Sequence, residues 1–171
     1  MKEQPMAANI DYAFLVMSLN DNFSVNRAVR YAATVLQEGV QPIVILTKAD
    51  LCPDVEILKE QIKEMLPQIE VHAVSALTGD GMDKLQMYLQ PGNTIALLGS
   101  SGVGKSTLIN LLVPDAEMET GQISQKIDRG KHTTRHSELF RVEEDSYIFD
   151  TPGFSSLELM GMEKEELRYY F

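Results

Sequence analysis

The residues from Thr94 to Ser106 read TIALLGSSGVGKS and decide the fold of this chain. From Gly99 onward they fit the pattern G-x-x-x-x-G-K-[ST], with an apolar strand-like run before it and an apolar helical segment after it. Glycines let backbone N–H groups turn toward phosphate oxygens, and the start of the next helix adds its positive dipole end. We expect Lys105 to reach the β- and γ-phosphates and Ser106 to ligate Mg²⁺. The pattern predicts a phosphate-binding loop with contacts from Gly99, Ser100, Ser101, Gly102, Val103, Gly104, Lys105, Ser106 and Thr107.

Short apolar runs alternate with helical patterns along the chain. The strand-like runs are 12–19, 43–46, 71–74 and 94–98, and the helical patterns are 24–38, 55–66, 80–89 and 105–112. Short apolar runs bounded by turn residues are typical of buried parallel strands. Two more runs, 138–142 and 146–149, flank Glu143-Glu144-Asp145 and predict a hairpin. The alternation predicts an α/β fold of the P-loop NTPase (Ras-like) type, with three layers and a mostly parallel sheet covered by helices on both faces.

The four residues Asp150-Thr151-Pro152-Gly153 follow the last strand-like run and match D-x-x-G. Downstream of a phosphate loop, such a carboxylate holds Mg²⁺ through a water, and the Gly153 N–H can meet the γ-phosphate. The alternative interpretation is an ordinary turn after a strand.

The residues Thr47-Lys48-Ala49-Asp50 follow the run 43–46 and resemble the [N/T]-K-x-D motif of GTPases. Guanine presents two donors, N1–H and the exocyclic amine, and the Asp50 carboxylate can accept both, while Lys48 lays its stem along the base. Adenine lacks this pair, so a buried carboxylate would stay unpaired. Thr47 replaces the Asn that usually ties the base loop to the phosphate loop, which predicts fewer such bonds and modest affinity. The alternative is a common strand-end turn.

Ser75-Ala76-Leu77 follow the run 71–74 and resemble the S-A-[LK] motif, whose backbone N–H contacts the guanine oxygen. A motif this short is weak on its own; its place after a strand and its distance from Thr47 support the interpretation as a base-reading motif. In ordinary small GTPases these base-reading motifs come after the phosphate loop and D-x-x-G; here they come first, in the order G4-G5-G1-G2-G3. An open parallel sheet permits this circular permutation because a site at the strand ends depends on spatial placement.

The composition is that of an ordinary globular chain, with 44% apolar and 23% charged residues among 171. No apolar run of about 18 residues predicts a membrane span. Cys52 has no partner for an internal disulfide, and one Cys with three His makes no evident zinc cluster. We expect a monomer in a reducing cytoplasm, without a membrane partner.

The net charge of −10 argues against a nucleic-acid-binding surface over the whole domain, because phosphate contacts need Lys and Arg. Residues 126–136 are the exception, with four basic residues and one acidic residue. A basic island in an acidic chain indicates a local role, such as contact with RNA; the alternative is a solvated loop.

With this motif order the chain resembles the RsgA (YjeQ/YloQ) family of circularly permuted, ribosome small-subunit-dependent GTPases of bacteria. The resemblance covers nearly all residues and is carried by residues 7–11, GSSGVGKSTLIN from Gly99, the hexapeptide 130–135 (GKHTTR) and DTPGF from Asp150. It implies Mg²⁺-dependent hydrolysis of GTP to GDP and phosphate, stimulated by the 30S subunit, contact with 16S rRNA and a role in maturation of that subunit.

Full-length members of that family carry an N-terminal OB-fold and a C-terminal zinc-binding domain. Residues 1–171 contain neither, and the chain ends on Tyr169-Tyr170-Phe171. We therefore expect a fragment that consists of one circularly permuted GTPase domain, and we expect zinc only in the missing C-terminal domain.

Hydrolysis needs a complete Mg²⁺ shell and a group that orients the attacking water. A switch threonine usually completes the Mg²⁺ shell; Thr133 and Thr134 are candidates, and the resemblance favours Thr134. Many GTPases place Gln directly after D-x-x-G to orient the attacking water, but Phe154 here cannot hydrogen-bond water. The resemblance and its place beside the threonines favour His132 in that role. The alternatives are that the threonines only stabilise a loop and that His132 is a surface or RNA-contacting residue.

Two other classes of function stay open at this point. One is a nucleotide-gated binding module whose hydrolysis is incidental, which Phe154 favours. The other is an ATP-using P-loop enzyme such as a kinase, against which Asp50 and the lack of an acceptor-site signature count.

Overall fold

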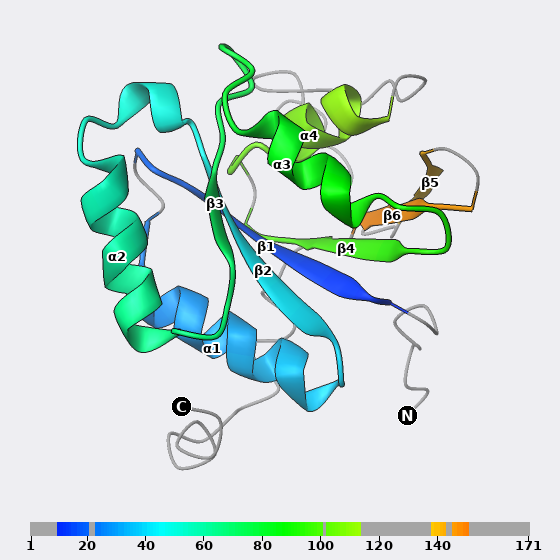
Figure 1. The fold of residues 1–171 in the computed structure, drawn as a ribbon, viewed down its shortest axis with the longest axis horizontal. Helices are drawn as coiled ribbons and strands as arrows, with labels where there is room; N and C mark the ends of the chain where they lie inside the picture. The colour runs from blue at the N-terminus through cyan, green and yellow to red at the C-terminus, as the bar shows by residue number, and fades with distance from the viewer. Residues whose placement is uncertain (1–9, 21–22, 101, 114–137, 143–144, 151–171) are drawn as a thin grey trace, which may run out of the picture.

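The computed structural model describes residues 10–20, 23–100, 102–113, 138–142 and 145–150 (Figure 1). Within these residues six strands form one sheet in the order β3-β2-β1-β4-β6-β5. Their bounds are β1 (Tyr12–Ser18), β2 (Gln41–Thr47), β3 (Val71–Ala73), β4 (Thr94–Leu98), β5 (Glu138–Arg141) and β6 (Tyr147–Asp150).

Most strands run parallel. β1 pairs in parallel with β2 on one side and with β4 on the other, and β4 pairs in parallel with β6. Only β5 runs antiparallel to its neighbour β6 within the described residues. The predicted hairpin and the mostly parallel sheet are therefore confirmed.

Helices cover both faces of the sheet, so the domain has three layers (Figure 1). One face is covered by α1 (Val25–Gln37) and α2 (Val55–Met65). The other is covered by α3 (Met82–Leu85), the short 3₁₀-helix η2 (Gln86–Tyr88) and α4 (Lys105–Leu112).

Alternate side chains of β1 pack into two hydrophobic cores, one on each face of the sheet. Leu15 and Met17 point to the α1–α2 face, whereas Phe14 and Val16 point to the α3–α4 face. All four side chains are almost fully buried. This explains why the sequence of β1 is a continuous apolar run: both of its faces lie in a core.

The predicted ends of α1 are confirmed. The Ser24 hydroxyl accepts a hydrogen bond from the Arg27 N–H at 3.2 Å, as an N-cap does. Gly39 has φ +75° and follows the helix directly after Glu38, a conformation that glycine adopts without steric cost.

The single helix predicted over 80–89 is wrong in its details. The helix begins at Met82, lasts for one turn, and continues as the 3₁₀-helix η2. Asp80 instead belongs to the preceding loop, where its carbonyl accepts a hydrogen bond from the Ser75 N–H at 2.9 Å. The tighter η2 turn places Tyr88 against Tyr12 and Phe14, with ring centroids 5.1 and 5.5 Å away. The sequence also predicts a loop over 121–135, which shows no clear periodicity, and a helical stretch over the charged residues 163–168; both lie outside the described residues.

Gly81, directly before α3, offers a test of how tightly the loop between β3 and α3 is packed. Its φ is +77°, and a Cβ atom added there would lie 2.3 Å from the Ala73 carbonyl oxygen. We expect Gly81→Ala to lower the free energy of unfolding by about 2 kcal/mol or more, since backbone strain and a clash with backbone add together. Urea unfolding measures this.

Gly79 in the same loop is the matched control, because its φ is +82° but nothing lies within 4 Å of an added Cβ. Gly79→Ala should cost only about 1 kcal/mol from strain. Equal losses for the two variants would contradict the close packing of Gly81 against β3.

Candidate functional site

Four parallel strands end at the same edge of the sheet. β2 ends at Thr47, β3 at Ala73, β4 at Leu98 and β6 at Asp150. Carboxyl ends of parallel strands form the usual ligand-binding edge of such a sheet. Three motifs that are separated along the chain therefore meet there: the base loop (47–51), the loop 75–80 and the phosphate loop (99–106).

The phosphate loop leaves β4 close to β1. A Cβ atom added at Gly99 would lie 2.6 Å from the Val16 carbonyl oxygen, so only glycine fits. Gly102 and Gly104 have φ +83° and +100°, and α4 begins at Lys105 as predicted. Backbone N–H groups at the start of a helix favour an anion. Ser101 lies outside the described residues.

Lys105 and Asp150 form an ion pair inside this loop region. Lys105 Nζ lies 3.7 Å from Asp150 Oδ1, which is longer than a hydrogen bond, and their side chains are 13% and 20% exposed. Burial raises the pKa of the Asp150 carboxyl above its ordinary value even though Lys105 opposes that shift. Burial likewise lowers the pKa of the Lys105 ammonium, against the pull of Asp150. The attraction between the two groups therefore offsets only part of the cost of burying each charge.

The donor set fits a Mg²⁺ ion. Asp150 Oδ1 is buried and has no hydrogen-bond partner among the described groups. A buried carboxylate oxygen that lacks a hydrogen bond is costly even beside a lysine, and a hydrated Mg²⁺ is bound through few carboxylates, waters and phosphates. Ser106 follows Lys105 in the first turn of α4, where its hydroxyl would ligate the ion directly while Asp150 would hold it through a water.

The base loop has an unusual backbone at its start. Lys48 has φ +60°, in the left-handed region, and the short 3₁₀-helix η1 (Ala49–Leu51) follows it. The Ala49 N–H donates to the Val74 carbonyl at 3.1 Å, which fixes the loop to the end of β3. Lys48 Nζ lies 3.5 Å from the Gly102 carbonyl oxygen, so the lysine reaches across toward the phosphate loop.

Thr47 joins the base loop to the phosphate loop directly. Its hydroxyl donates to the Val103 carbonyl at 2.6 Å and lies 3.3 Å from the Met17 carbonyl, and the residue is only 5% exposed. A hydroxyl has a single proton, and the shorter distance assigns it to Val103. Thr47 therefore makes the connection expected of an Asn at this position, with a single strong donor.

Asp50 is exposed to solvent, but one oxygen of its carboxylate accepts a hydrogen bond from a buried residue. Ser75 Oγ donates to Asp50 Oδ1 at 2.7 Å, and Ser75 itself is 1% exposed. The expectation of a buried Asp50 carboxylate is therefore not met by the chain alone. The selectivity argument applies once a base covers this carboxylate.

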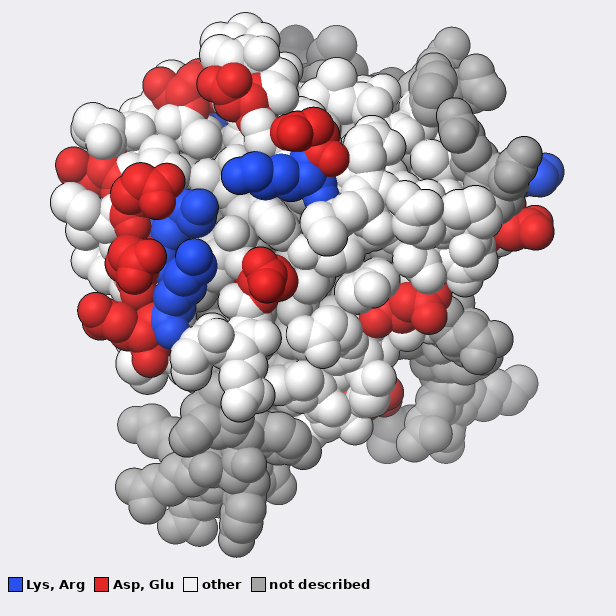
Figure 2. Space-filling view, in the orientation of Figure 1, with Lys and Arg blue, Asp and Glu red and all other residues white. Residues whose placement is uncertain are grey.

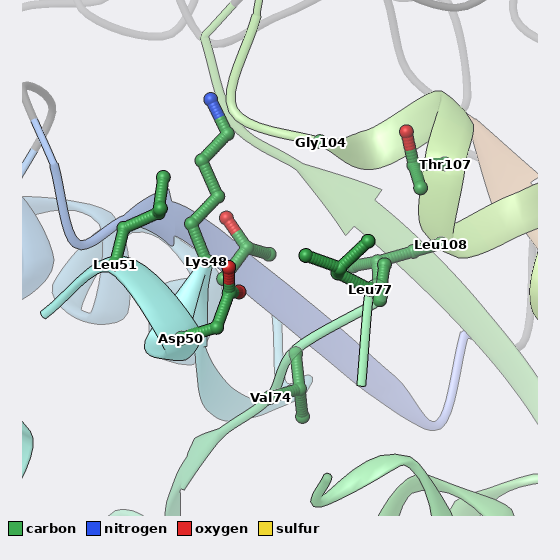
Figure 3. A pocket seen from close by; sticks show the side chains of 10 residues that line it. Lys48, Asp50, Leu51, Val74, Leu77, Gly104, Thr107 and Leu108 are labelled. Atoms are coloured by element: carbon green, nitrogen blue, oxygen red, sulfur yellow. The ribbon is translucent and has the colours of Figure 1, made fainter. Parts of the chain in front are cut away.

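A pocket of about 440 Å³ opens between these loops (Figure 3). Lys48, Asp50 and Leu51 lie on one side of it, and Leu77 and Thr107 on the other. The complete lining is Thr47, Lys48, Asp50, Leu51, Val74, Ala76, Leu77, Gly104, Thr107 and Leu108. The pocket thus joins residues of both base motifs to the first turns of α4.

Three of these lining residues were missed by sequence reasoning: Leu51, Val74 and Leu108. Val74 and Leu108 fit the apolar pattern of core residues, which hides any second role. Leu51 is 63% exposed, and its position directly after Asp50 was the available signal. Conversely, His132, Thr133, Thr134 and Gly153 lie outside the described residues, so their placement stays a prediction.

The described part of the chain contains no group of three or more His, Cys, Asp or Glu side chains placed to hold a metal ion. Among its helices, none is both long and apolar enough to traverse a bilayer.

The sheet, the phosphate loop and the base loop beside it define a P-loop nucleotide-binding domain. Residues 1–160 match the sequence model of a family described as RsgA GTPase. The chain belongs to this family, which confirms the resemblance drawn from its motifs.

Named relatives agree with this assignment. The chain is 40% identical over 161 residues to the small ribosomal subunit biogenesis GTPase RsgA 2 of Vibrio parahaemolyticus, which covers 94% of this chain and 45% of the relative. It is 41% identical over 163 residues to the RsgA protein of Xylella fastidiosa, with 95% and 49% covered. The chain spans about half the length of the curated relatives it matches.

Two solved structures share the fold. YjeQ from Thermotoga maritima superposes with a TM-score of 0.73 at 28% identity, covering 95% of this chain and 55% of that one. YloQ, described as a circularly permuted GTPase, gives 0.62 at 32% identity, with 95% and 51% covered. The predicted fold class is thereby confirmed.

The Thr47 hydroxyl provides a test of the link between the two loops. We expect Thr47→Val to lower the free energy of unfolding by about 1–2 kcal/mol, because it leaves the buried Val103 carbonyl without its donor. Affinity for GDP should fall as well, since both loops lose their common support. Urea unfolding and calorimetric titration measure the two effects.

Thr34→Val is the matched control. The Thr34 hydroxyl donates to the Arg30 carbonyl at 3.0 Å on the exposed side of α1, a helix that does not line the pocket. This variant should stay within about 0.5 kcal/mol of the parent. A Thr47→Val chain that is as stable as the control would contradict the bridging role.

Proposed function

We propose that this chain binds GTP with Mg²⁺, hydrolyses it to GDP and phosphate, and serves in maturation of the small ribosomal subunit. The observation that carries the proposal is the placement of Asp50 beside the phosphate loop, across a pocket of about 440 Å³. The names of its relatives, small ribosomal subunit biogenesis GTPases, support the same conclusion.

The phosphate groups would lie along residues 99–106. Backbone N–H groups of this loop and the ammonium of Lys105 would neutralise the β- and γ-phosphates. Ser106, and Asp150 through a water, would hold Mg²⁺, with Thr134 as a further ligand and Gly153 meeting the γ-phosphate. The ion would neutralise charge that develops on the transferred phosphoryl group.

The base would occupy the pocket between Lys48 and Leu77. Asp50 accepts from N1–H and the exocyclic amine of guanine, and the backbone of residues 75–77 meets its oxygen. An adenine base would leave the Asp50 carboxylate covered and unpaired, a cost of about 1–3 kcal/mol or more for a charged group. We therefore expect GTP to be preferred over ATP.

Hydrolysis would depend on residues beyond the pocket. His132 would orient the attacking water, because Phe154 occupies the place where many GTPases have Gln. A group in a loop can be positioned by a partner, which fits activity that rises when the small subunit binds.

The charge on the described surface bears on how the ribosome would be approached. Along α2 the exposed Glu56, Glu60 and Glu64 alternate with Lys59 and Lys63, so this face carries both signs of charge (Figure 2). Such a mixed surface offers no concentrated basic patch to a phosphate backbone. We propose that 16S rRNA is contacted instead through the basic residues 126–135, and that the protein works as a monomer in the cytoplasm.

Single-turnover hydrolysis tests this function. We expect the chain to cleave GTP and not ATP, and to do so faster when 30S subunits are added. His132→Ala should lower the stimulated rate by about 10²-fold or more, which is typical of losing a positioned side chain that assists proton transfer. The Kd for GTP should stay near that of the parent.

The outcomes separate the competing classes of function. GTP binding without any hydrolysis, with or without subunits, would favour a nucleotide-gated binding module. Cleavage of ATP as readily as GTP would refute the guanine site. Equal stimulated rates for His132→Ala and the parent would exclude His132 from catalysis.

A further inference from the structure

A second carboxylate lies directly across the sheet from Asp150. Glu138 is the first residue of β5, and the antiparallel register pairs it with Asp150, the last residue of β6. Residues opposite each other in an antiparallel pair have Cβ atoms about 4.5–5.5 Å apart. Two acidic side chains are therefore neighbours at the end of the strand that carries Asp150 to the proposed Mg²⁺ site.

The alternation of side chains along β5 and β6 shows which face the two carboxylates share. Ile148 and Phe140, which lie opposite each other, pack into the core under α3 and α4. Side chains two positions further along a strand return to the same face, so Asp150 and Glu138 point to that side as well. The contact of Asp150 with Lys105, the first residue of α4, agrees with this. Both acidic side chains thus lie on the face that carries the start of α4.

The two carboxylates interact through their charges. Burial raises the pKa of the Asp150 carboxyl most, the negative charge of Glu138 raises it further, and Lys105 opposes both effects. Like charges directly opposite one another destabilise a strand pair. Among the described residues, no lysine or arginine forms an ion pair with Glu138. One lysine therefore accompanies two carboxylates, and the cluster as a whole is negative.

A divalent cation would relieve this repulsion. Mg²⁺ gives up its waters reluctantly and is held in proteins by one or two carboxylates, waters and phosphates. Under the proposed function, the ion is ligated by Ser106 and held by Asp150 through a water. Carboxylates outside the first shell of a metal ion orient its ligands and change its affinity. Glu138, opposite Asp150 and on the same face, is placed for that role.

We infer that Glu138 is a positioning residue for Mg²⁺, which strengthens the binding of the ion through its negative charge and through the ion's bound waters. This inference rests on the proposed function, in which Mg²⁺ accompanies the nucleotide at Asp150. Glu138 is exposed, whereas the side chain of Asp150 is 20% exposed. Solvent and salt therefore screen the charge of Glu138 in part, and its effect should be moderate.

The charge of Glu138 should act with opposite sign on the ion and on the nucleotide. A negative charge attracts Mg²⁺ but repels the phosphates that would lie along residues 99–106. Removing this charge should therefore weaken the cooperation between ion and nucleotide without weakening the phosphate loop itself. Damage to the fold or to the loop would instead weaken nucleotide binding both with and without the ion.

Calorimetric titration of the 171-residue chain with GDP, once with Mg²⁺ and once with a chelator, tests this role. In the parent, Mg²⁺ should tighten GDP binding. In Glu138→Gln this gain should be about tenfold smaller, a change within the usual range for coupling between two ligands. Without Mg²⁺ the variant should bind GDP as tightly as the parent or up to about threefold more tightly, since one repelling charge is gone.

The next position on β5 supplies a matched control. Leu139 pairs with Phe149, whose side chain packs into the other core, so Leu139 points to the opposite face, where it is 57% exposed. Combining Glu138→Gln with Leu139→Glu keeps the net charge and moves the carboxylate across the sheet; this double variant should behave like Glu138→Gln. Glu138→Asp keeps the charge in place and should retain most of the Mg²⁺ effect. Thermal unfolding confirms that each variant is folded.

The outcomes are distinguishable. An unchanged Mg²⁺ effect in Glu138→Gln would overturn the role of Glu138, as would recovery of the effect in the double variant or an equal loss of GDP affinity with and without Mg²⁺. The nucleotide site would stand in each of these cases. A parent chain that binds no GDP, or whose affinity for GDP does not respond to Mg²⁺, would refute the proposed function at this site, and the inference with it.

Discussion

The parallel register across β1 is the constraint from which the site follows. Because Ser18 lies opposite Thr47 and Leu15 opposite Leu98, the carboxyl ends of β2 and β4 come to one edge of the sheet. β1 is buried on both faces, so a slip of one residue would exchange its two sets of core side chains. The two apolar cores therefore set the position of the nucleotide loops, although none of these core side chains of β1 lines the pocket.

Polar contacts between the loops then fix individual side chains of the site that the two cores bring together. The Thr47 hydroxyl reaches Val103 from the end of β2, Ser75 reaches Asp50 from the end of β3, and each contact links two loops that are far apart in the chain. The Lys105–Asp150 pair adds a third link, between α4 and the end of β6. A site made of such cross-links depends on which strand ends are adjacent, which explains how the base-reading motifs can precede the phosphate loop in sequence.

The sequence predicted the elements that local chemistry controls. The bounds of β4 and α4 were predicted correctly, because the glycines of the phosphate loop leave little choice of backbone there. The bounds of the helix predicted over 80–89 were wrong. At its start, Asp80 is hydrogen-bonded to Ser75 and belongs to the preceding loop, and at its end Tyr88 packs against Tyr12 in a 3₁₀-helix. The pocket role of Leu51 and the contact between Ser75 and Asp50 depend on neighbouring strands, which no single stretch of sequence reveals.

Amide hydrogen exchange with and without Mg²⁺-bound GDP tests most directly whether these loops form one guanine site. We expect GDP to slow exchange together in residues 47–51, 75–78 and 102–106, which lie on both sides of the pocket. ADP should slow exchange in the phosphate loop alone, since the Asp50 carboxylate offers adenine no pair of acceptors that it can use. Protection by GDP confined to residues 102–106, with the base loop and the loop at Ser75 unchanged, would contradict a guanine site built across β1.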